Sequence, residues 1–162
     1  MTDFEALYKR YCKEIFRFAL YLCGNYAEAE DIASETFVLA WNAVGRIRAA
    51  TAKSYLFAIA RNCYLERLRR GIRQKELDER LPDPRSGPHA DAESRAELDS
   101  VLAALQQFPE VDRTALLLRV QEEMSYQEIA EAMQLPLSVI KVKIHRTRLK
   151  LAQWRAATEV KR

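Results

Sequence analysis

Apolar residues recur every three or four positions along most of this 162-residue chain, which is the pattern of amphipathic helices. In the first half the pattern predicts helices over residues 4–23, 26–44 and 53–70, and a loop over residues 45–52. In the second half it predicts helices over residues 94–107, 111–122, 125–133 and 137–153. The stretch between the halves contains Pro82, Pro84, Gly87 and Pro88, which is typical of a flexible linker. The expected fold is all-α, with two small helical domains at residues 1–72 and 93–162 joined by a linker at residues 73–92.

Residues 125–151 have the layout of a helix-turn-helix whose second helix enters a DNA major groove. Ser125 is followed three residues later by Glu128, which predicts a capping box at the start of the first helix. Pro136 ends the turn, and Ser138 can cap the longer helix that follows. That second helix is rich in cations.

At about 100° per residue, the second helix of this motif divides into two faces. The side expected to pack on the domain carries Leu137, Ile140, Ile144 and Leu151. The opposite side carries Ser138, Val142, His145, Arg146 and Leu149, with Lys141 at its edge. Arginine can bond guanine edges and valine can contact a thymine methyl, so this face suits base reading. Lys143, Arg148 and Lys150 lie elsewhere and suit phosphates. The alternative is an ordinary solvated surface helix with many cations. It does not explain why the capping box, the turn and the two faces of the helix all agree with a helix-turn-helix.

The net charge is only +3, but the cations are unevenly distributed. Residues 137–162 contain eight Lys or Arg against one acidic residue. A second basic run, opposed by Glu66, consists of Arg61, Arg67, Arg69, Arg70, Arg73 and Lys75. Two separated basic patches favour a protein that contacts nucleic acid at two places.

The first domain carries two further patterns, each with two interpretations. Acidic residues at 28, 30, 31 and 35 precede Phe37 and Trp41, so they can dock a basic partner or simply favour the helix dipole. In residues 53–70, Tyr55, Phe57 and Tyr64 are interleaved with the arginines and Asn62. This mixture suits unstacked bases, although the aromatic rings can instead belong to the core.

Other functional classes find little support in the sequence. No nucleophile–base pair, phosphate-cradling glycine loop or metal-ligand pattern occurs, so we expect no enzyme, no metal and no cofactor. Cys12, Cys23 and Cys63 are interpreted as buried free thiols, with a redox pair between Cys12 and Cys23 as the alternative. The N-terminus is acidic and no apolar run could span a bilayer, so a cytoplasmic protein without membrane insertion is expected.

Three motifs in order resemble those of a bacterial RNA polymerase sigma factor of the extracytoplasmic-function group (sigma-70 superfamily, group IV). Residues 31–37 (DIASETF) with Ala40 and Trp41 resemble its core-binding motif. Residues 55–62 (YLFAIARN) and 65–70 (LERLRR) resemble its promoter-melting helix, and residues 125–130 and 140–146 its helix-turn-helix. Larger sigma factors carry another folded domain where this chain has a short linker. Ser34 replaces a common Gln, Val142 a small polar residue, and Glu123 and Gln134 stand where Gly is frequent.

This resemblance implies roles for particular residues. The set implied for the clamp helices of the polymerase's largest subunit is Asp31, Ser34, Glu35, Phe37 and Trp41. The set implied for the −10 element is Arg46, Arg48, Tyr55, Arg61, Asn62, Arg67, Arg69 and Arg70. The loop at residues 45–52 would capture a base flipped out of the non-template strand. The set implied for the −35 element is Arg119, Tyr126, Ser138, Lys141, Val142, His145 and Arg146, with Arg119 and Tyr126 on phosphates. The second domain would also sit on the flap of the second-largest subunit.

The group's members are usually held inactive by an anti-sigma factor, often one bound to the membrane, so this partner is also implied. Two alternatives remain open at this point. One is an adaptor that mimics a sigma factor and sequesters an anti-sigma factor, although its DNA-reading helix would be expected to be degraded. The other is a stand-alone helix-turn-helix regulator, which leaves the acidic motif and the basic run at 61–75 unexplained.

Overall fold

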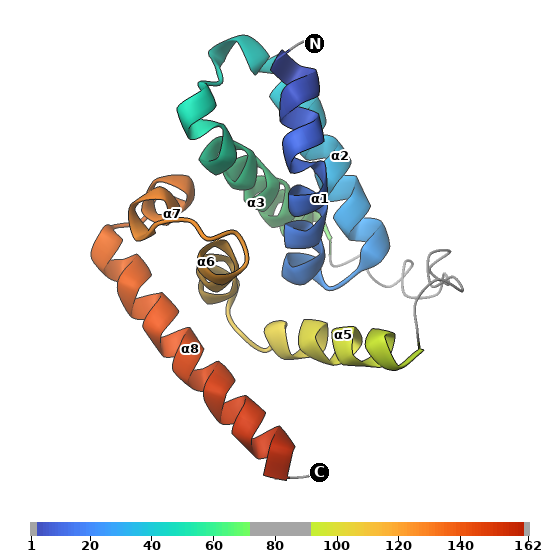
Figure 1. The fold of residues 1–162 in the computed structure, drawn as a ribbon, viewed down its shortest axis with the longest axis vertical. Coiled ribbons are helices and arrows are strands. Elements are labelled where there is room, and N and C mark those ends of the chain that lie inside the picture. Colours follow the sequence, from blue (N-terminus) through green and yellow to red (C-terminus); the bar gives the residue numbers. More distant parts are fainter. Residues whose placement is uncertain (1–2, 72–91, 161–162) are drawn as a thin grey trace. The chain divides into compact units, whose positions relative to one another are not determined.

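The computed structural model describes residues 3–71 and 92–160 and confirms an all-helical fold, with no strand in those ranges. The chain divides into two compact units, Met1–Gln106 and Gln107–Arg162. The first contains α1 (Asp3–Cys23), α2 (Tyr26–Asn42), the 3-10 turns η1 (Val44–Arg46) and η2 (Ala49–Thr51), α3 (Ala52–Arg70) and α5 (Ala92–Leu105). The second contains α6 (Glu110–Val120), α7 (Tyr126–Met133) and α8 (Leu137–Val160) (Figure 1). The predicted linker at 73–92 lies, except for Ala92, outside the described residues.

The first unit is built on three helices, α1, α2 and α3, which pack against one another. Their shared core contains Ile15, Phe18, Ile32 and Phe57, all fully buried, and the Phe18 and Phe57 rings meet edge to face at 5.1 Å. Between α1 and α2 the chain turns at Gly24, whose φ of +73° favours glycine. Asn25 then caps α2, because its side-chain oxygen accepts a hydrogen bond from the Glu28 backbone N–H at 2.8 Å.

Helix α5 packs with the first unit, whereas its position after the linker predicts that it belongs to the second domain. It contacts α1, and the side-chain nitrogen of Gln106, just after its end, donates to the Leu22 carbonyl at 3.0 Å. Apolar spacing predicts that a helix has a buried face but not which neighbour covers it, so this placement could not be derived from periodicity.

The second unit is a compact helix-turn-helix supported by α6. Leu118, Ile129, Ile140 and Ile144 are buried in its core. The predicted capping box is confirmed: the Glu128 N–H donates to Ser125 Oγ at 3.1 Å, and the Ser125 N–H donates to the Glu128 carboxylate at 3.0 Å. Helix α8 continues to Val160, beyond the predicted end at residue 153. None of the described helices is long and apolar enough to cross a membrane.

Two residues of this unit, Glu123 and Gln134, have left-handed backbone conformations, with φ of 55° and 53°. Both stand where the resemblance expects glycine, and Gln134 ends α7 directly before the turn into α8. A residue with a Cβ atom is strained in this conformation.

Replacing Gln134 with glycine should therefore stabilise the protein by about 1 kcal/mol, because glycine adopts this conformation without the Cβ clash. Chemical denaturation of the full chain measures the change. The matched control is Gln127→Gly, at an exposed helical position in α7, which should destabilise by about 1 kcal/mol. A loss of stability in both variants would contradict the strain at position 134.

Candidate nucleic-acid and polymerase interface

The predicted facing of α8 is confirmed by its burial pattern. Ile140 and Ile144 are buried against the unit, while the predicted reading residues are exposed. The exposed set is Ser138, Lys141, Val142, His145 and Arg146. Val142 keeps 46% of its surface exposed, although it is apolar. An exposed helix face that combines cations with an apolar side chain can hydrogen-bond base edges and contact a thymine methyl.

Two other cations of this unit have internal partners that the sequence did not indicate. Arg119 donates to the Met124 carbonyl at 3.0 Å, and its guanidinium lies 4.4 Å from the centre of the Tyr126 ring. Arg119 therefore stabilises the turn that leads into α7, next to Glu123 with its left-handed backbone. Lys143 pairs with Asp112 of α6 at 3.4 Å, so it ties α8 to α6. Contact of Arg119, Tyr126 or Lys143 with phosphate stays a prediction.

Helix α2 presents an acidic face and an aromatic face. Asp31, Ser34 and Glu35 are exposed, as a polar partner would require. Trp41 is 56% exposed, whereas Phe37, from the same predicted set, is only 6% exposed. Phe37 is thus a supporting residue rather than a side chain that reaches out to a partner.

Phe37 and Trp41 belong to an aromatic cluster completed by two residues of α1, Phe4 and Tyr8. The Phe4 ring lies 4.9 Å from Trp41, and the Tyr8 ring lies 4.9 Å from Phe37, both edge to face. Beside the cluster is a groove of about 560 Å³ between α1 and α2, which Cys12, Phe16, Ser34 and Val38 also line. The sequence does not indicate that Phe4 and Tyr8 join this cluster, because their helical spacing in α1 predicts only a buried stripe.

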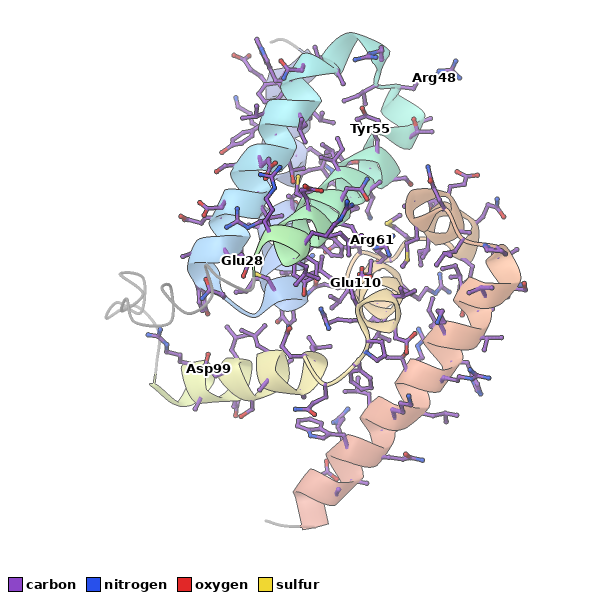
Figure 2. The ribbon with its side chains drawn as sticks, turned by 180° about the vertical axis from the view of Figure 1, so that it is seen from behind. Glu28, Arg48, Tyr55, Arg61, Asp99 and Glu110 are labelled. Atoms are coloured by element: carbon purple, nitrogen blue, oxygen red, sulfur yellow. The ribbon has the colours of Figure 1, made fainter. Side chains whose placement is uncertain are left out.

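The predicted −10 residues lie on the η1–η2 segment and on α3. Arg46 and Arg48 are exposed on either side of Ile47, and Tyr55 and Asn62 are exposed on α3. Figure 2 shows Arg48 and Tyr55 at the same end of the first unit, with Arg61 farther along α3. Phe57 and Tyr64 are buried, so for these two rings the core interpretation holds. Arg69 and Arg70 are exposed and pair with Glu66 at 3.6 and 3.3 Å.

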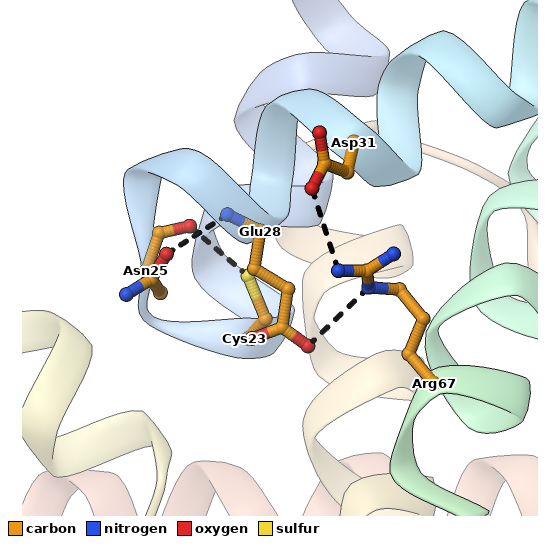
Figure 3. Close-up of polar contacts among 5 residues, drawn as sticks. All are labelled: Cys23, Asn25, Glu28, Asp31 and Arg67. Atoms are coloured by element: carbon orange, nitrogen blue, oxygen red, sulfur yellow. Dashed lines mark hydrogen bonds and ion pairs between the residues drawn. The ribbon is translucent and has the colours of Figure 1, made fainter. Parts of the chain in front are cut away.

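Arg67 differs from the other arginines of this set because it is turned toward α2. Its Nη2 lies 3.4 Å from the Asp31 carboxylate, and its Nε lies 3.8 Å from the Glu28 carboxylate (Figure 3). Arg67 is therefore paired within the first unit, and its contact with −10 DNA stays a prediction. Nothing in the sequence pairs residues 31 and 67, which only the packing of α2 on α3 brings together.

The cysteines do not form the redox pair considered above. Cys12 and Cys23 lie on the same helix, eleven residues and about 16 Å apart, whereas disulfides need Cα atoms within about 7 Å. Burial raises the pKa of Cys23 to about 12 and that of Cys63 to about 11, so both thiols stay protonated at neutral pH. The described residues contain no group of His, Cys, Asp or Glu that could hold a metal ion.

Comparison with known proteins places these surfaces in a family. Residues 7–74 match the family Sigma-70 region 2, and residues 98–151 match the family Sigma-70, region 4. The ECF RNA polymerase sigma factor SigE of Mycolicibacterium smegmatis is 30% identical, over 96% of this chain and 63% of the relative. The RNA polymerase sigma-H factor of Pseudomonas aeruginosa is 34% identical, over 90% of this chain and 82% of the relative. The chain belongs to the extracytoplasmic-function group of sigma factors.

The fold of this sigma factor is also that of a solved relative. The sigma factor RpoE of Bartonella quintana, solved in complex with the anti-sigma factor NepR, matches with a TM-score of 0.75 and 22% identity. The match covers 94% of this chain and 96% of RpoE. At this identity the likeness concerns the fold alone. This sigma factor spans slightly less than two thirds of the length of SigE.

The matched regions contain most of the surfaces described above. The region 2 match extends from Leu7 past the end of α3, so it includes Tyr8, the acidic face of α2 and the predicted −10 residues, while Phe4 precedes it. The region 4 match begins inside α5 and ends at Leu151, so it includes the reading face of α8. Residues 152–160 of α8 extend beyond the match.

Proposed function

We propose that this sigma factor binds core RNA polymerase and directs promoter-specific transcription initiation by recognising −10 and −35 elements. Its role is binding and positioning, with no chemical reaction of its own. The observation that carries this proposal is the division of α8 into a buried apolar face and an exposed reading face within a capped helix-turn-helix. The two DNA-reading domains of this proposal are residues 1–72 and 93–162, joined by the linker at 73–92, although α5, at the start of the second, packs with the first unit.

The first domain would bind the clamp helices of the polymerase's largest subunit. Asp31, Ser34 and Glu35 would supply the polar contacts, and Trp41 the apolar anchor. Phe37 supports this anchor through Phe4, whose ring contacts both Phe37 and Trp41. Complementary charge speeds the encounter of two surfaces, while a buried aromatic side chain supplies much of the affinity. The acidic and aromatic faces of α2 suit these two tasks.

The same domain would hold the melted −10 element. Arg46 and Arg48 would contact the backbone of the strand around a base flipped into the loop, and Tyr55 would stack on a base. Arg61, Asn62, Arg69 and Arg70 would extend this surface along α3. Extruding a base costs a few kcal/mol, which contacts in a pocket can offset.

The second domain would read the −35 element as duplex DNA and contact the flap of the second-largest subunit. Lys141, Val142, His145 and Arg146 would face base edges, and Ser138 would approach the backbone at the start of α8. Arg119 and Tyr126, whose guanidinium and ring are stacked, would contact phosphates. Arg148, exposed on the same helix, would add a phosphate contact.

Regulation by an anti-sigma factor is part of this proposal. RpoE of Bartonella quintana was solved in complex with the anti-sigma factor NepR. The protein CnrH was solved in complex with the cytosolic domain of CnrY. A partner of this kind would cover the polymerase-binding and DNA-binding surfaces of the present chain. We place the protein in the cytoplasm, held at the membrane when its anti-sigma factor is membrane-bound.

Run-off transcription tests the proposal. Core polymerase is assayed with and without the protein on fragments from upstream of its own gene, and binding to core is measured in parallel. Transcripts that depend on the protein and start at one position are expected. Binding to core without transcripts from any upstream fragment would contradict promoter-directed initiation there. No binding to core would overturn the proposal in favour of an adaptor or a stand-alone regulator.

Glu35→Lys should weaken core binding by about 1 kcal/mol, because a cation would replace an exposed carboxylate on the acidic face of α2. The affinity of labelled protein for core polymerase is measured without promoter DNA, at two salt concentrations. The control is Glu97→Lys, the same charge reversal at an exposed position of α5. Equal affinities for the wild type and Glu35→Lys would contradict the placement of this surface.

A further inference from the structure

The guanidinium of Arg67 in α3 lies between two carboxylates of α2, those of Glu28 and Asp31 (Figure 3). The Nη2 atom donates a hydrogen bond to Asp31 at 3.4 Å. The Nε atom is buried and reaches Glu28 only as an ion pair at 3.8 Å, without a hydrogen-bond partner among the described residues. Arg67 is therefore held by charge on two sides rather than by one tight bond.

The two carboxylates differ in their access to solvent. The Glu28 side chain is 20% exposed and sits in the first turn of α2, where its backbone N–H is held by Asn25. The Asp31 side chain is 66% exposed and lies on the acidic face with Ser34 and Glu35. Asp31 thus faces Arg67 on one side and an incoming partner on the other.

We propose that Arg67 is an internal competitor for Asp31, which sets the affinity of this sigma factor for core polymerase. In the free protein Arg67 neutralises the carboxylate that a cation of the polymerase would otherwise bind. Binding of core then has to displace one ion pair in order to form another. The inference rests on the proposed role of Asp31 in core binding and adds a residue that opposes it.

Exchange of this kind is physically reasonable because exposed ion pairs are weak and readily replaced. When Asp31 turns to a partner, Arg67 still has Glu28 beside it, so its charge is not left buried alone. Arg69 and Arg70, which pair with Glu66 of their own helix, have no such link to the acidic face of α2. Among these arginines, the effect should belong to Arg67.

Affinity for core polymerase, measured without DNA, tests the proposal through four proteins: wild type, Arg67→Gln, Asp31→Asn and the double variant. Arg67→Gln should bind core about two- to fivefold more tightly, since it releases Asp31 from a weak ion pair. Asp31→Asn should bind more weakly, and adding Arg67→Gln to it should change nothing. The matched control is Arg10→Gln in α1, which removes the same charge from the same unit and should leave the affinity unchanged. Arg10 is exposed and pairs with Glu14 of its own helix.

The outcomes separate this inference from the proposed function. If Asp31→Asn binds core as well as the wild type, Asp31 is not a contact, and the competitor role of Arg67 fails while core binding itself stands. If Asp31→Asn binds weakly but Arg67→Gln is no tighter than the wild type, only the competitor role fails. An equal gain in Arg67→Gln and Arg10→Gln would also overturn it, because a general charge effect would then be sufficient.

A purely structural role for Arg67 predicts the opposite sign. If the residue mainly fastened α3 to α2, its loss would lower thermal stability and weaken core binding in both backgrounds. Arg67→Lys keeps the positive charge but replaces the planar guanidinium, which can face two carboxylates at once, with a single ammonium nitrogen. It should fold and bind core with an affinity between those of the wild type and Arg67→Gln. Affinity no higher than that of the wild type, in a folded Arg67→Lys protein, would contradict competition.

Discussion

Trp41→Ala is expected to weaken binding of this sigma factor to core polymerase by about 2 kcal/mol or more, roughly thirtyfold. Trp41 is 56% exposed, yet its ring is fixed by the edge-to-face contact with Phe4 at 4.9 Å. A large aromatic side chain already held in position loses little conformational freedom when a partner covers it. The adjacent groove offers space for side chains of that partner.

The measurement is a titration of core polymerase with labelled protein, accompanied by thermal unfolding of each variant. Leu39→Ala is the matched control, since Leu39 is an exposed apolar residue of the same helix that does not line the groove. The control should bind core nearly as well as the wild type. Wild-type affinity in a folded Trp41→Ala protein would show that the aromatic cluster is not the anchor.

Features that depend on neighbouring residues in the chain could be predicted from the sequence. The capping box at Ser125 and Glu128 follows from a three-residue spacing, and the facing of α8 follows from helical periodicity. The strained position of Gln134 is also local, because the turn from α7 into α8 requires a left-handed residue whatever its identity. The capping box and the facing of α8 are the basis of the −35 prediction.

Features that depend on packing between helices could not be predicted in this way. Arg67 and Asp31 are 36 positions apart, and Lys143 and Asp112 are 31 apart, so each pair exists only because two helices pack. A basic run in the sequence gives the number of cations but not which of them already has an anionic partner. The sequence therefore predicts the charge of Arg67 but not its pairing with Asp31.

The aromatic cluster shows the same limit for apolar residues. Phe4 and Tyr8 follow a helical spacing that is equally typical of a buried core, and Phe37 belongs to the motif that resembles a core-binding segment. In the structure Tyr8 is exposed and Phe37 is buried. Periodicity places residues on one side of a helix, but the neighbouring helix decides how much of that side remains open.

Arg146→Ala should lower the affinity of the holoenzyme for its −35 duplex by about 1–3 kcal/mol, roughly tenfold to a hundredfold. Arg146 is exposed on the reading face of α8, one residue from His145 and four from Val142. An arginine there can make two hydrogen bonds to a guanine, and its loss leaves those acceptors without a partner. The affinity is measured on the promoter found by run-off transcription and on a duplex with a scrambled −35 element.

Arg148→Ala is the matched control, because it removes an arginine that is expected to contact phosphate rather than a base. Arg148 is exposed on the same helix but lies off the reading face, where it suits a phosphate. Its loss should weaken binding to both duplexes equally and reduce the salt dependence, since one fewer counterion is released. The loss in Arg146→Ala should instead fall on the cognate duplex. If Arg146→Ala weakens both duplexes equally, Arg146 contacts the backbone, and base reading would have to come from Lys141, Val142 and His145.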